Sequence, residues 1–390
     1  MQTTLPQPNA DAIAHSLALS EKIHQAIQLN DGWMNFADFM HRALYEPGLG
    51  YYSGGAKKFG FAGDFVTAPE ISPLFAKTIA NQVAQVIQAL NIQNIQSSVL
   101  ELGAGTGRLA KDLLLALHDS KSTIQHYFIL EVSAYLRDVQ REKLRAELPA
   151  ELFEKVVWLN ALPKEFNGFI LGNEVLDALP IHIVKRREQG FFEMGVVSDN
   201  SQFLWQEKPL KDVQLTQFVE ALNLSENYAI EVCPAASGLI ASLAGMLQTG
   251  ALMMVDYGFS RAEYYHPQRH QGTLMCHYRH HAHDNPLLYL GLQDITAHVD
   301  FTRIAEAGVD AQLDLVGFTT QAQFLINAGM MKYLEEAAAD KQENYLPVVA
   351  AAQKLLSPAE MGDLFKVIAF TKNLDIDLIG FSAGDKTHTL

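Results

Sequence analysis

The stretch Val99-Leu100-Glu101-Leu102-Gly103-Ala104-Gly105-Thr106-Gly107 joins a short apolar run to a turn with three glycines. The residues that follow, 108–118, carry leucines at 109, 113, 114 and 117, which is the spacing of one helix face. Glycine is needed where the backbone must adopt a positive φ or lie against a ligand. The stretch therefore predicts a strand, a tight turn and a helix, the first unit of a nucleotide-binding α/β domain.

The spacing of these glycines separates two classes of cofactor. A dinucleotide-binding turn would place its third glycine at position 108, where the chain has Arg108. The predicted strand also carries an acid, Glu101, just before the turn. A carboxylate there would repel a pyrophosphate but suits a cationic ligand with an amino-acid end, such as S-adenosylmethionine. The turn therefore favours a methyltransferase over a NAD-dependent dehydrogenase.

The composition of the chain limits the possible functions, partners and locations further. The 390 residues exceed one usual domain, so a core with a large insertion or a second lobe is expected. A hydrophobic fraction of 48% with 19% charged residues predicts a globular protein, and a net charge of −15 argues against a nucleic-acid partner. Cys233 and Cys276 give no disulfide framework, and no apolar run is long enough for a membrane span. Residues 1–20 lack a basic start and an apolar core, so a cytoplasmic location is expected.

Four predicted strands end in an acid or an amide. Their final polar residues are Glu101, Glu131, Asn173 with Glu174, and Asp256. Ligands bind at the carboxyl ends of parallel strands, and an acid that closes the second strand can accept both ribose hydroxyls. A single such acid is more often a helix cap or a solvated side chain. Four at one edge of a sheet favour a binding site.

The pattern along the chain indicates several segments. Strands alternate with helices up to residue 180, which predicts a mostly parallel sheet. The stretch 45–70, rich in glycine and aromatic residues, is interpreted as an ordered lid loop, with a packed connection as the alternative. The expected segments are an N-terminal helical cap with the lid (1–90), the first part of the core (91–180), an antiparallel insertion (181–232), the continued core (233–258), a histidine-rich insertion (259–300) and C-terminal strands and helices (301–390).

Taken together, these motifs closely resemble the MidA family, which is related to the mitochondrial arginine methyltransferase that acts in respiratory complex I assembly. The resemblance spans about residues 35 to 330 and implies a class I methyltransferase, with a Rossmann-like α/β fold that binds S-adenosyl-L-methionine. For the mitochondrial relative it also implies symmetric dimethylation of a protein arginine. The matching stretches are Gly50-Tyr51-Tyr52, 63–70, 101–107, Glu131-Val132-Ser133, 173–180, Asp256-Tyr257-Gly258, Gly272-Thr273-Leu274 and 294–301.

The resemblance assigns a set of cofactor-binding residues. The glycines of the turn would let the backbone approach the methionine end of the cofactor, and Glu131 would hold the ribose. Leu159 would flank the adenine with Asn160, although apolar packing explains Leu159 equally well. Asp64 after Gly63 would receive the methionine ammonium, although an aspartate in that position is often a turn residue. The full expected set is Gly63, Asp64, Glu101, Gly103, Gly105, Gly107, Glu131, Leu159, Asn160 and Asn173.

We expect Glu174 and Asp177 to bind the group that accepts the methyl. An arginine guanidinium is always protonated, and a pair of carboxylates can bind it bidentately and align one nitrogen for attack. The alternative is that Asp177 only caps the next turn. His280 matches the family pattern in a substrate-facing loop, and Asp300 would add negative charge near the acceptor. The histidines between 266 and 283 lack a zinc-ligand spacing, so no metal is expected.

The leading hypothesis is therefore an S-adenosylmethionine-dependent protein arginine N-methyltransferase, with a respiratory complex I subunit or another protein as substrate. The alternatives are a small-molecule methyltransferase and a non-catalytic S-adenosylmethionine-binding assembly factor. A scaffold of that last kind has no need of buried acids that face the sulfonium. The number of chains in the assembly, a homodimer included, stays open.

Overall fold

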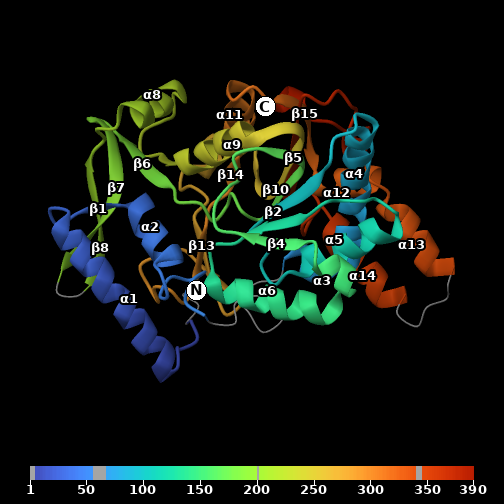
Figure 1. Ribbon diagram of the computed structural model, residues 1–390. Coiled ribbons are helices and arrows are strands. Elements are labelled where there is room, and N and C mark those ends of the chain that lie inside the picture. Colours follow the sequence, from blue (N-terminus) through green and yellow to red (C-terminus); the bar gives the residue numbers. More distant parts are fainter. Residues whose placement is uncertain (1–4, 56–66, 200–201, 340–344) are drawn as a thin grey trace. The chain divides into compact units, whose positions relative to one another are not determined.

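The computed structural model describes residues 5–55, 67–199, 202–339 and 345–390 (Figure 1). The chain forms two compact units. Unit 1 comprises residues 1–65, 177–236 and 261–298, and unit 2 comprises 66–176, 237–260 and 299–390. The helix over 73–92, which the sequence assigned to the N-terminal cap, belongs to unit 2. None of the described helices is both long and apolar enough to cross a membrane.

Unit 2 is built on one sheet in the strand order β15-β16-β10-β5-β2-β3-β4, with β14 beside β10. The neighbours from β10 to β4 pair in parallel, as does β14 with β10, whereas β16 is antiparallel to both β10 and β15. The predicted α/β fold with a mostly parallel sheet is confirmed. The strands are β2 (Ser98–Leu102), β3 (Tyr127–Leu130), β4 (Val156–Leu159), β5 (Phe166–Asn173), β10 (Leu247–Phe259), β14 (Val299–Asp300), β15 (Asp314–Thr320) and β16 (Phe365–Lys372).

The helices of unit 2 supply the rest of its core. The leucines at 109, 113, 114 and 117 are buried, as their spacing predicted, and Ser133 caps the next helix by accepting from the Leu136 N–H. The C-terminal helices α13 and α14 and the short α7 were not foreseen. The helices are α3 (Ala68–Ile71), α4 (Pro73–Ile92), α5 (Arg108–Asp119), α6 (Ala134–Glu147), α7 (Ala150–Phe153), α9 (Pro234–Met246), α11 (Phe301–Asp310), α12 (Gln321–Asn327), α13 (Met330–Ala339) and α14 (Tyr345–Leu356), with 3-10 turns η2 (Ile379–Phe381) and η3 (Thr387–Thr389).

Unit 1 contains two antiparallel sheets. The larger has the order β1-β7-β6-β9 with β8 beside β7, and the smaller the order β12-β11-β13. The antiparallel insertion after residue 181 is present, but the sequence analysis missed α8 and β9. The elements are α1 (Ala10–Leu29), β1 (Met34–Asn35), α2 (Phe36–Tyr45), β6 (His182–Arg187), β7 (Gly190–Asp199), β8 (Gln202–Pro209), α8 (Val213–Ala221), β9 (Ala229–Val232), α10 (Arg261–Tyr264), η1 (Pro267–Arg269), β11 (Met275–Tyr278), β12 (His281–His283) and β13 (Asp294–Thr296).

Two glycines allow the three central strands of unit 2 to approach closely near their starts. Ser98 of β2 lies opposite Gly168 of β5, which in turn lies opposite Gly250 of β10. Both glycines have a left-handed φ, +138° and +146°. A Cβ on Gly168 would lie 1.8 Å from the Ser98 carbonyl oxygen, and one on Gly250 would lie 1.9 Å from the Gly168 carbonyl oxygen. Any side chain at these positions must push the strands apart.

Replacing Gly168 with alanine should therefore destabilise the protein by at least about 3 kcal/mol, because the new methyl group meets rigid backbone rather than a flexible side chain. The free energy of unfolding in urea measures this loss. Gly238→Ala is the matched control, since Gly238 lies in α9 with no atom within 4 Å of its added Cβ. That control should be neutral or gain up to about 1 kcal/mol. Equal losses in the two variants would contradict the close-approach argument.

Candidate active site

The glycine turn after β2 has the conformation that the sequence predicted. Gly103, Gly105 and Gly107 have φ values of +60°, +52° and +80°, and Gly107 is the N-cap of α5. A Cβ on Gly105 would have no atom within 4 Å, so this glycine is required by its backbone angle and not by crowding within the protein. The Thr106 hydroxyl donates a hydrogen bond to the Glu70 carboxylate of α3, which anchors the turn. The three glycines therefore leave the backbone after β2 without a side chain at every second position of the turn.

Gln140 of α6 joins three parts of this region. Its Nε2 donates to the Gly105 carbonyl oxygen at 2.9 Å and to Glu131 Oε2 at 3.2 Å. Its Oε1 accepts from the Trp158 indole N–H at 2.9 Å. Gln140 is fully buried, so all of these bonds are made away from water. The amide therefore fixes the glycine turn relative to the acid that follows β3 and to strand β4.

Two buried acids lie at this edge of the sheet. Glu131 is 5% exposed, and its Oε1 accepts from the Ser133 N–H at 2.9 Å. Glu101 is 2% exposed, and its Oε2 accepts from the Tyr127 hydroxyl at 2.6 Å. Burial raises the pKa of both, and for Glu101 it outweighs the Tyr127 hydrogen bond and brings the pKa to about 7. The neighbouring Glu131 adds to this rise because two like charges disfavour each other.

The end of β4 is held by one side chain. Arg137 of α6 donates from Nε to the Glu131 carbonyl oxygen at 2.8 Å and from its guanidinium to Asn160 Oδ1 at 2.7 Å. The same guanidinium also donates to the Leu159 carbonyl oxygen. Arg137 thus holds Leu159 and Asn160, which were expected to flank an adenine, at the same edge of the sheet as Glu131.

The residue after β5 has an unusual backbone. Glu174 has a φ of +53°, and residues other than glycine adopt this backbone angle at a cost of about 1 kcal/mol or more. Its N–H donates to the Val255 carbonyl oxygen at 2.9 Å. The carboxylate of Asp256, which is 1% exposed, accepts from the N–H groups of Val175 at 3.1 Å and Leu176 at 2.8 Å. These hydrogen bonds hold the chain in a sharp turn at Glu174, the first residue after β5.

Asn173, the last residue of β5, has an oxygen that faces no protein donor. Its Nδ2 donates to Glu174 Oε1 at 3.1 Å, whereas its Oδ1 is buried and has no hydrogen-bond partner in the described structure. A buried acceptor without a donor is costly unless a ligand supplies one. Since the register places Asn173 beside Val255 and next to Gly172, which pairs with Leu102, this oxygen lies at the edge that carries the glycine turn.

The remaining expected site residues are placed as follows. Asp177 is buried in unit 1, where its carbonyl oxygen accepts from the Ala297 N–H at 3.1 Å. Asp300 is the N-cap of α11 and accepts from the Arg303 N–H at 3.2 Å. His280 is exposed in the two-residue turn between β11 and β12, with a φ of +62°. The predicted pairing of Asp177 with Glu174 stays a prediction, and Gly63 and Asp64 lie outside the described residues.

Sequence reasoning missed the residues that hold this site together. Gln140 and Arg137 sit on the helix after β3, and a helical pattern gives no sign that their polar ends turn inward. Asp256 was noted as an acid at a strand end, but its hydrogen bonds to the chain after β5 join residues about 80 positions apart. The described residues contain no group of three or more histidine, cysteine or acidic side chains placed to hold a metal ion.

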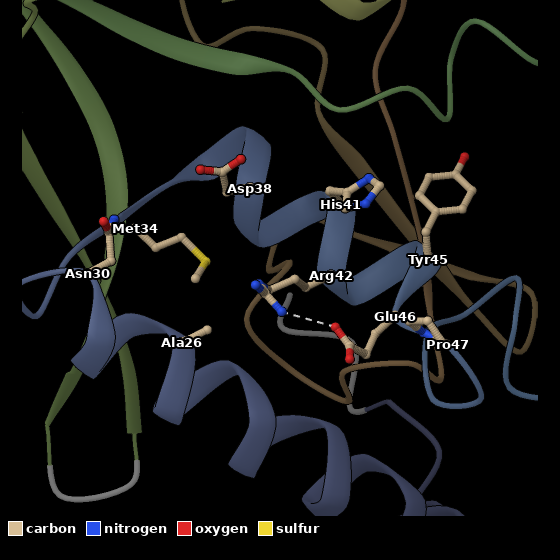
Figure 2. Close-up of a pocket in the computed structure, with 9 residues that line it drawn as sticks. All are labelled: Ala26, Asn30, Met34, Asp38, His41, Arg42, Tyr45, Glu46 and Pro47. Atoms are coloured by element: carbon tan, nitrogen blue, oxygen red, sulfur yellow. Dashed lines mark hydrogen bonds and ion pairs between the residues drawn. The ribbon is translucent and has the colours of Figure 1, made fainter.

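A separate hollow lies beside α1 and α2 in unit 1 (Figure 2). Its charged groups are already paired: Glu46 accepts from Arg42 at 3.1 Å and from Lys22 at 3.2 Å, and Asp38 accepts from the Asn35 side chain at 2.9 Å. The hollow has a volume of about 440 Å³, and the carboxylates of its lining already have polar partners. Its lining consists of Ala26, Asn30, Met34, Asp38, His41, Arg42, Tyr45, Glu46 and Pro47.

Several known proteins are similar to this chain in sequence, and a solved structure is similar to it in fold. A family model described as "Putative S-adenosyl-L-methionine-dependent methyltransferase" matches residues 78–319. The mitochondrial protein arginine methyltransferase NDUFAF7 of Danio rerio is 28% identical and covers 86% of this chain and 82% of its own length. The Homo sapiens protein of the same name is also 28% identical, with 87% and 80% covered. A Burkholderia thailandensis protein crystallised with S-adenosyl-homocysteine is 47% identical, with a TM-score of 0.95 over 99% of this chain and 100% of that one.

These similarities settle two expectations from the sequence. The class I methyltransferase fold is confirmed by the structural match to the S-adenosyl-homocysteine complex. The cytoplasmic location is wrong, because the curated relatives from Danio rerio and Homo sapiens are named mitochondrial. That expectation depended on the absence of a recognisable leader in residues 1–20, which is a weak signal of location.

The raised pKa of Glu101 gives the ligand-free protein a pH-dependent stability. The folded state holds the Glu101 proton more tightly than the unfolded chain, so stability falls as the pH rises from 4.5 to about 7. Above about pH 7 the full cost, about 3 kcal/mol, is present. Glu101→Gln removes the charge and can still accept from Tyr127. The stability advantage of the variant over the wild type should therefore be small at pH 5 and grow toward about this amount by pH 8.

Urea unfolding of the ligand-free proteins at several pH values measures this difference. Glu154→Gln, which alters an exposed acid of the same unit, serves as the control and should follow the wild-type pH profile. A wild type and a Glu101→Gln variant with parallel profiles would show that Glu101 is already ionised at pH 5.

Proposed function

The chain belongs to the S-adenosyl-L-methionine-dependent methyltransferase family whose model covers residues 78–319, and on that premise we propose that it methylates an arginine of a protein. The curated relatives at 27–29% identity are named protein arginine methyltransferases. The observation that carries the proposal for this chain is the carboxylate of Glu174, held in a left-handed turn at the end of β5 by Asp256.

The residues at the carboxyl edge of the sheet suit the cofactor. The glycines at 103, 105 and 107 allow close approach to the backbone, the Asn173 Oδ1 needs a donor such as an ammonium, and buried acids favour a cation. We assign the ribose to Glu131 and the adenine side to Leu159 and Asn160. When bound, S-adenosylmethionine supplies a methyl group on a positively charged sulfur. The protein's own part is to hold the acceptor nitrogen in line with that methyl group.

Glu174 suits a guanidinium acceptor. The guanidinium carries its positive charge at any physiological pH, and a carboxylate can accept two of its N–H groups in a fixed plane. As one nitrogen forms the new N–C bond, the S–C bond of the cofactor would break to leave S-adenosyl-homocysteine, and the nitrogen would lose a proton to a carboxylate or to water. A nearby carboxylate stabilises the positive charge through that change. The Asn173 amide donates to Glu174 Oε1 and so limits the orientations of the carboxylate. Asp177, three positions later in the chain, is our candidate for a second acid at the acceptor.

The other two expected catalytic residues are given no role in this proposal. The Asp300 carboxylate is occupied as a helix cap, and His280 is exposed in a hairpin turn.

Glu174→Gln should lower the rate of methyl transfer at least about 100-fold, because the neutral amide neither balances the guanidinium charge nor accepts at two equivalent oxygens. The assay supplies the radiolabelled cofactor and a protein extract, and mass spectrometry then identifies methylarginine in the labelled protein. Binding of S-adenosyl-homocysteine by calorimetry should change less than about twofold, since the substitution acts on the acceptor side. Glu154→Gln should leave both measurements unchanged.

Two results would overturn this proposal. Label that enters only small molecules would mean that the acceptor is not a protein. Cofactor binding without any transfer to the extract would support a non-catalytic binding protein instead.

Asp256→Asn should act through Glu174. The substitution weakens the hydrogen bonds that fix the turn, so kcat on the labelled protein should fall about tenfold or more, with little change in cofactor affinity. If Asp256 positions Glu174, adding Asp256→Asn to Glu174→Gln should cost little more than Glu174→Gln alone. Losses that multiply in the double variant would contradict this coupling, and thermal unfolding of each variant shows whether the fold is retained.

A further inference from the structure

Unit 2 has a second concave surface, a groove of about 1000 Å³ near the ends of β16 and η2. Part of its floor is apolar: Leu374, Leu378 and Phe381 belong to the buried core, and Val316 and Ile376 pack against that core while partly exposed. The uncharged polar residues of the lining are Gln93, Thr371, Asn373 and Ser382. Three exposed aspartates, Asp314, Asp375 and Asp377, line the same groove.

The strand register separates this groove from the cofactor site. Lys372, at the end of β16, lies opposite Gly250 near the start of β10, and Asp314 at the start of β15 lies opposite Thr371. The groove is therefore at the edge of the sheet where the parallel strands begin. The glycine turn and Glu174 follow the last residues of β2 and β5, at the opposite edge. The groove is not part of the methyl-transfer site.

The charge of the groove selects its occupant. None of its three aspartates has an ion pair with another residue in the described parts of the chain, and the lining contains no basic side chain among those residues. Three carboxylates around an apolar floor repel phosphate groups and anionic membranes and attract lysine or arginine. A ligand that contacts both the floor and the rim must combine apolar and basic side chains.

The edge of the sheet indicates the shape of that ligand. Strand β15 is the last strand in the sheet order, and its outer backbone is covered at Phe318, whose N–H donates to Asp385 and whose carbonyl oxygen accepts from the Lys386 N–H. The first residues of the same strand, Asp314 and Val316, border the groove instead. An extended peptide can lie along such an edge and alternate its side chains between two environments.

We propose that this groove docks an extended segment of a partner protein in which lysine or arginine alternates with apolar residues. The apolar side chains contact the floor at Val316 and Ile376, and the basic side chains pair with the aspartate rim. The docking surface is separate from the methyl-transfer site, so the proposal holds whether or not the acceptor is an arginine.

The test uses a fluorescein-labelled peptide of alternating Leu or Val and Lys, with binding to the full chain followed by fluorescence anisotropy. The triple variant Asp314→Asn, Asp375→Asn, Asp377→Asn should bind this peptide at least about tenfold more weakly than the wild type. A triple variant that removes the same charge from exposed positions of unit 2, Asp119→Asn, Glu142→Gln, Glu154→Gln, is the matched control. It should bind within about twofold of the wild type, because distant surface charges are screened by salt.

Two further peptides test the two halves of the surface. A peptide with glutamate in place of each lysine should not bind, and one with Gly and Ser in place of Leu and Val should bind at least about fivefold more weakly, since it loses the apolar contacts. Equal losses in the two triple variants would show that net charge, and not the groove, attracts the peptide. Unchanged affinity in the aspartate variant, or binding of the glutamate peptide, would overturn the proposal.

Discussion

The parallel register of strands β2, β5 and β10 decides where every functional group of unit 2 lies. Leu102 pairs with Gly172, and Asn173 pairs with Val255, so β2 and β5 end beside the part of β10 that precedes Asp256. The glycine turn follows the end of β2, Glu174 follows the end of β5, and Asp256 lies in β10 directly after Val255. The register in turn requires the close approach at Gly168 and Gly250, where no Cβ fits. A fold that shifted one strand by one residue would turn its polar end group away from the others.

Buried acids determine which charge of ligand this edge of the sheet favours. Glu101 and Glu131 are almost fully buried, and their pKa values are raised because the protein gives them fewer donors than water would. A cationic ligand at the same edge reverses this cost, since a positive charge nearby favours the ionised carboxylate. The acids thus favour a cationic cofactor over an anionic one, which suits the sulfonium of S-adenosylmethionine, whose demethylated form, S-adenosyl-homocysteine, is bound to the Burkholderia thailandensis relative.

How far the sequence predicts this structure depends on the range of each interaction. The glycine turn and the leucine face of α5 are local patterns, and both are present as expected. Gln140 could not be found in this way, because its bonds reach residues 35 and 18 positions away and nothing in a helical pattern marks an inward amide. Helices were expected within 301–390, but α13 and α14 were not placed individually. The expected role of His280 came from a family pattern. Sequence alone does not show whether the side chain of a turn residue is exposed, as that of His280 is.

The backbone of Glu174 is the strongest structural argument that this residue acts in function. A left-handed φ in a residue with a side chain costs free energy, and glycine at this position would avoid that cost. The structure instead uses a buried aspartate, with two hydrogen bonds from consecutive N–H groups, to maintain the turn with glutamate in it. The Glu174 side chain is only half-buried, and the adjacent Asn173 amide donates to it. The arrangement is explained if the carboxylate is needed for a ligand, and a protonated guanidinium is the ligand that a fixed, planar carboxylate binds best.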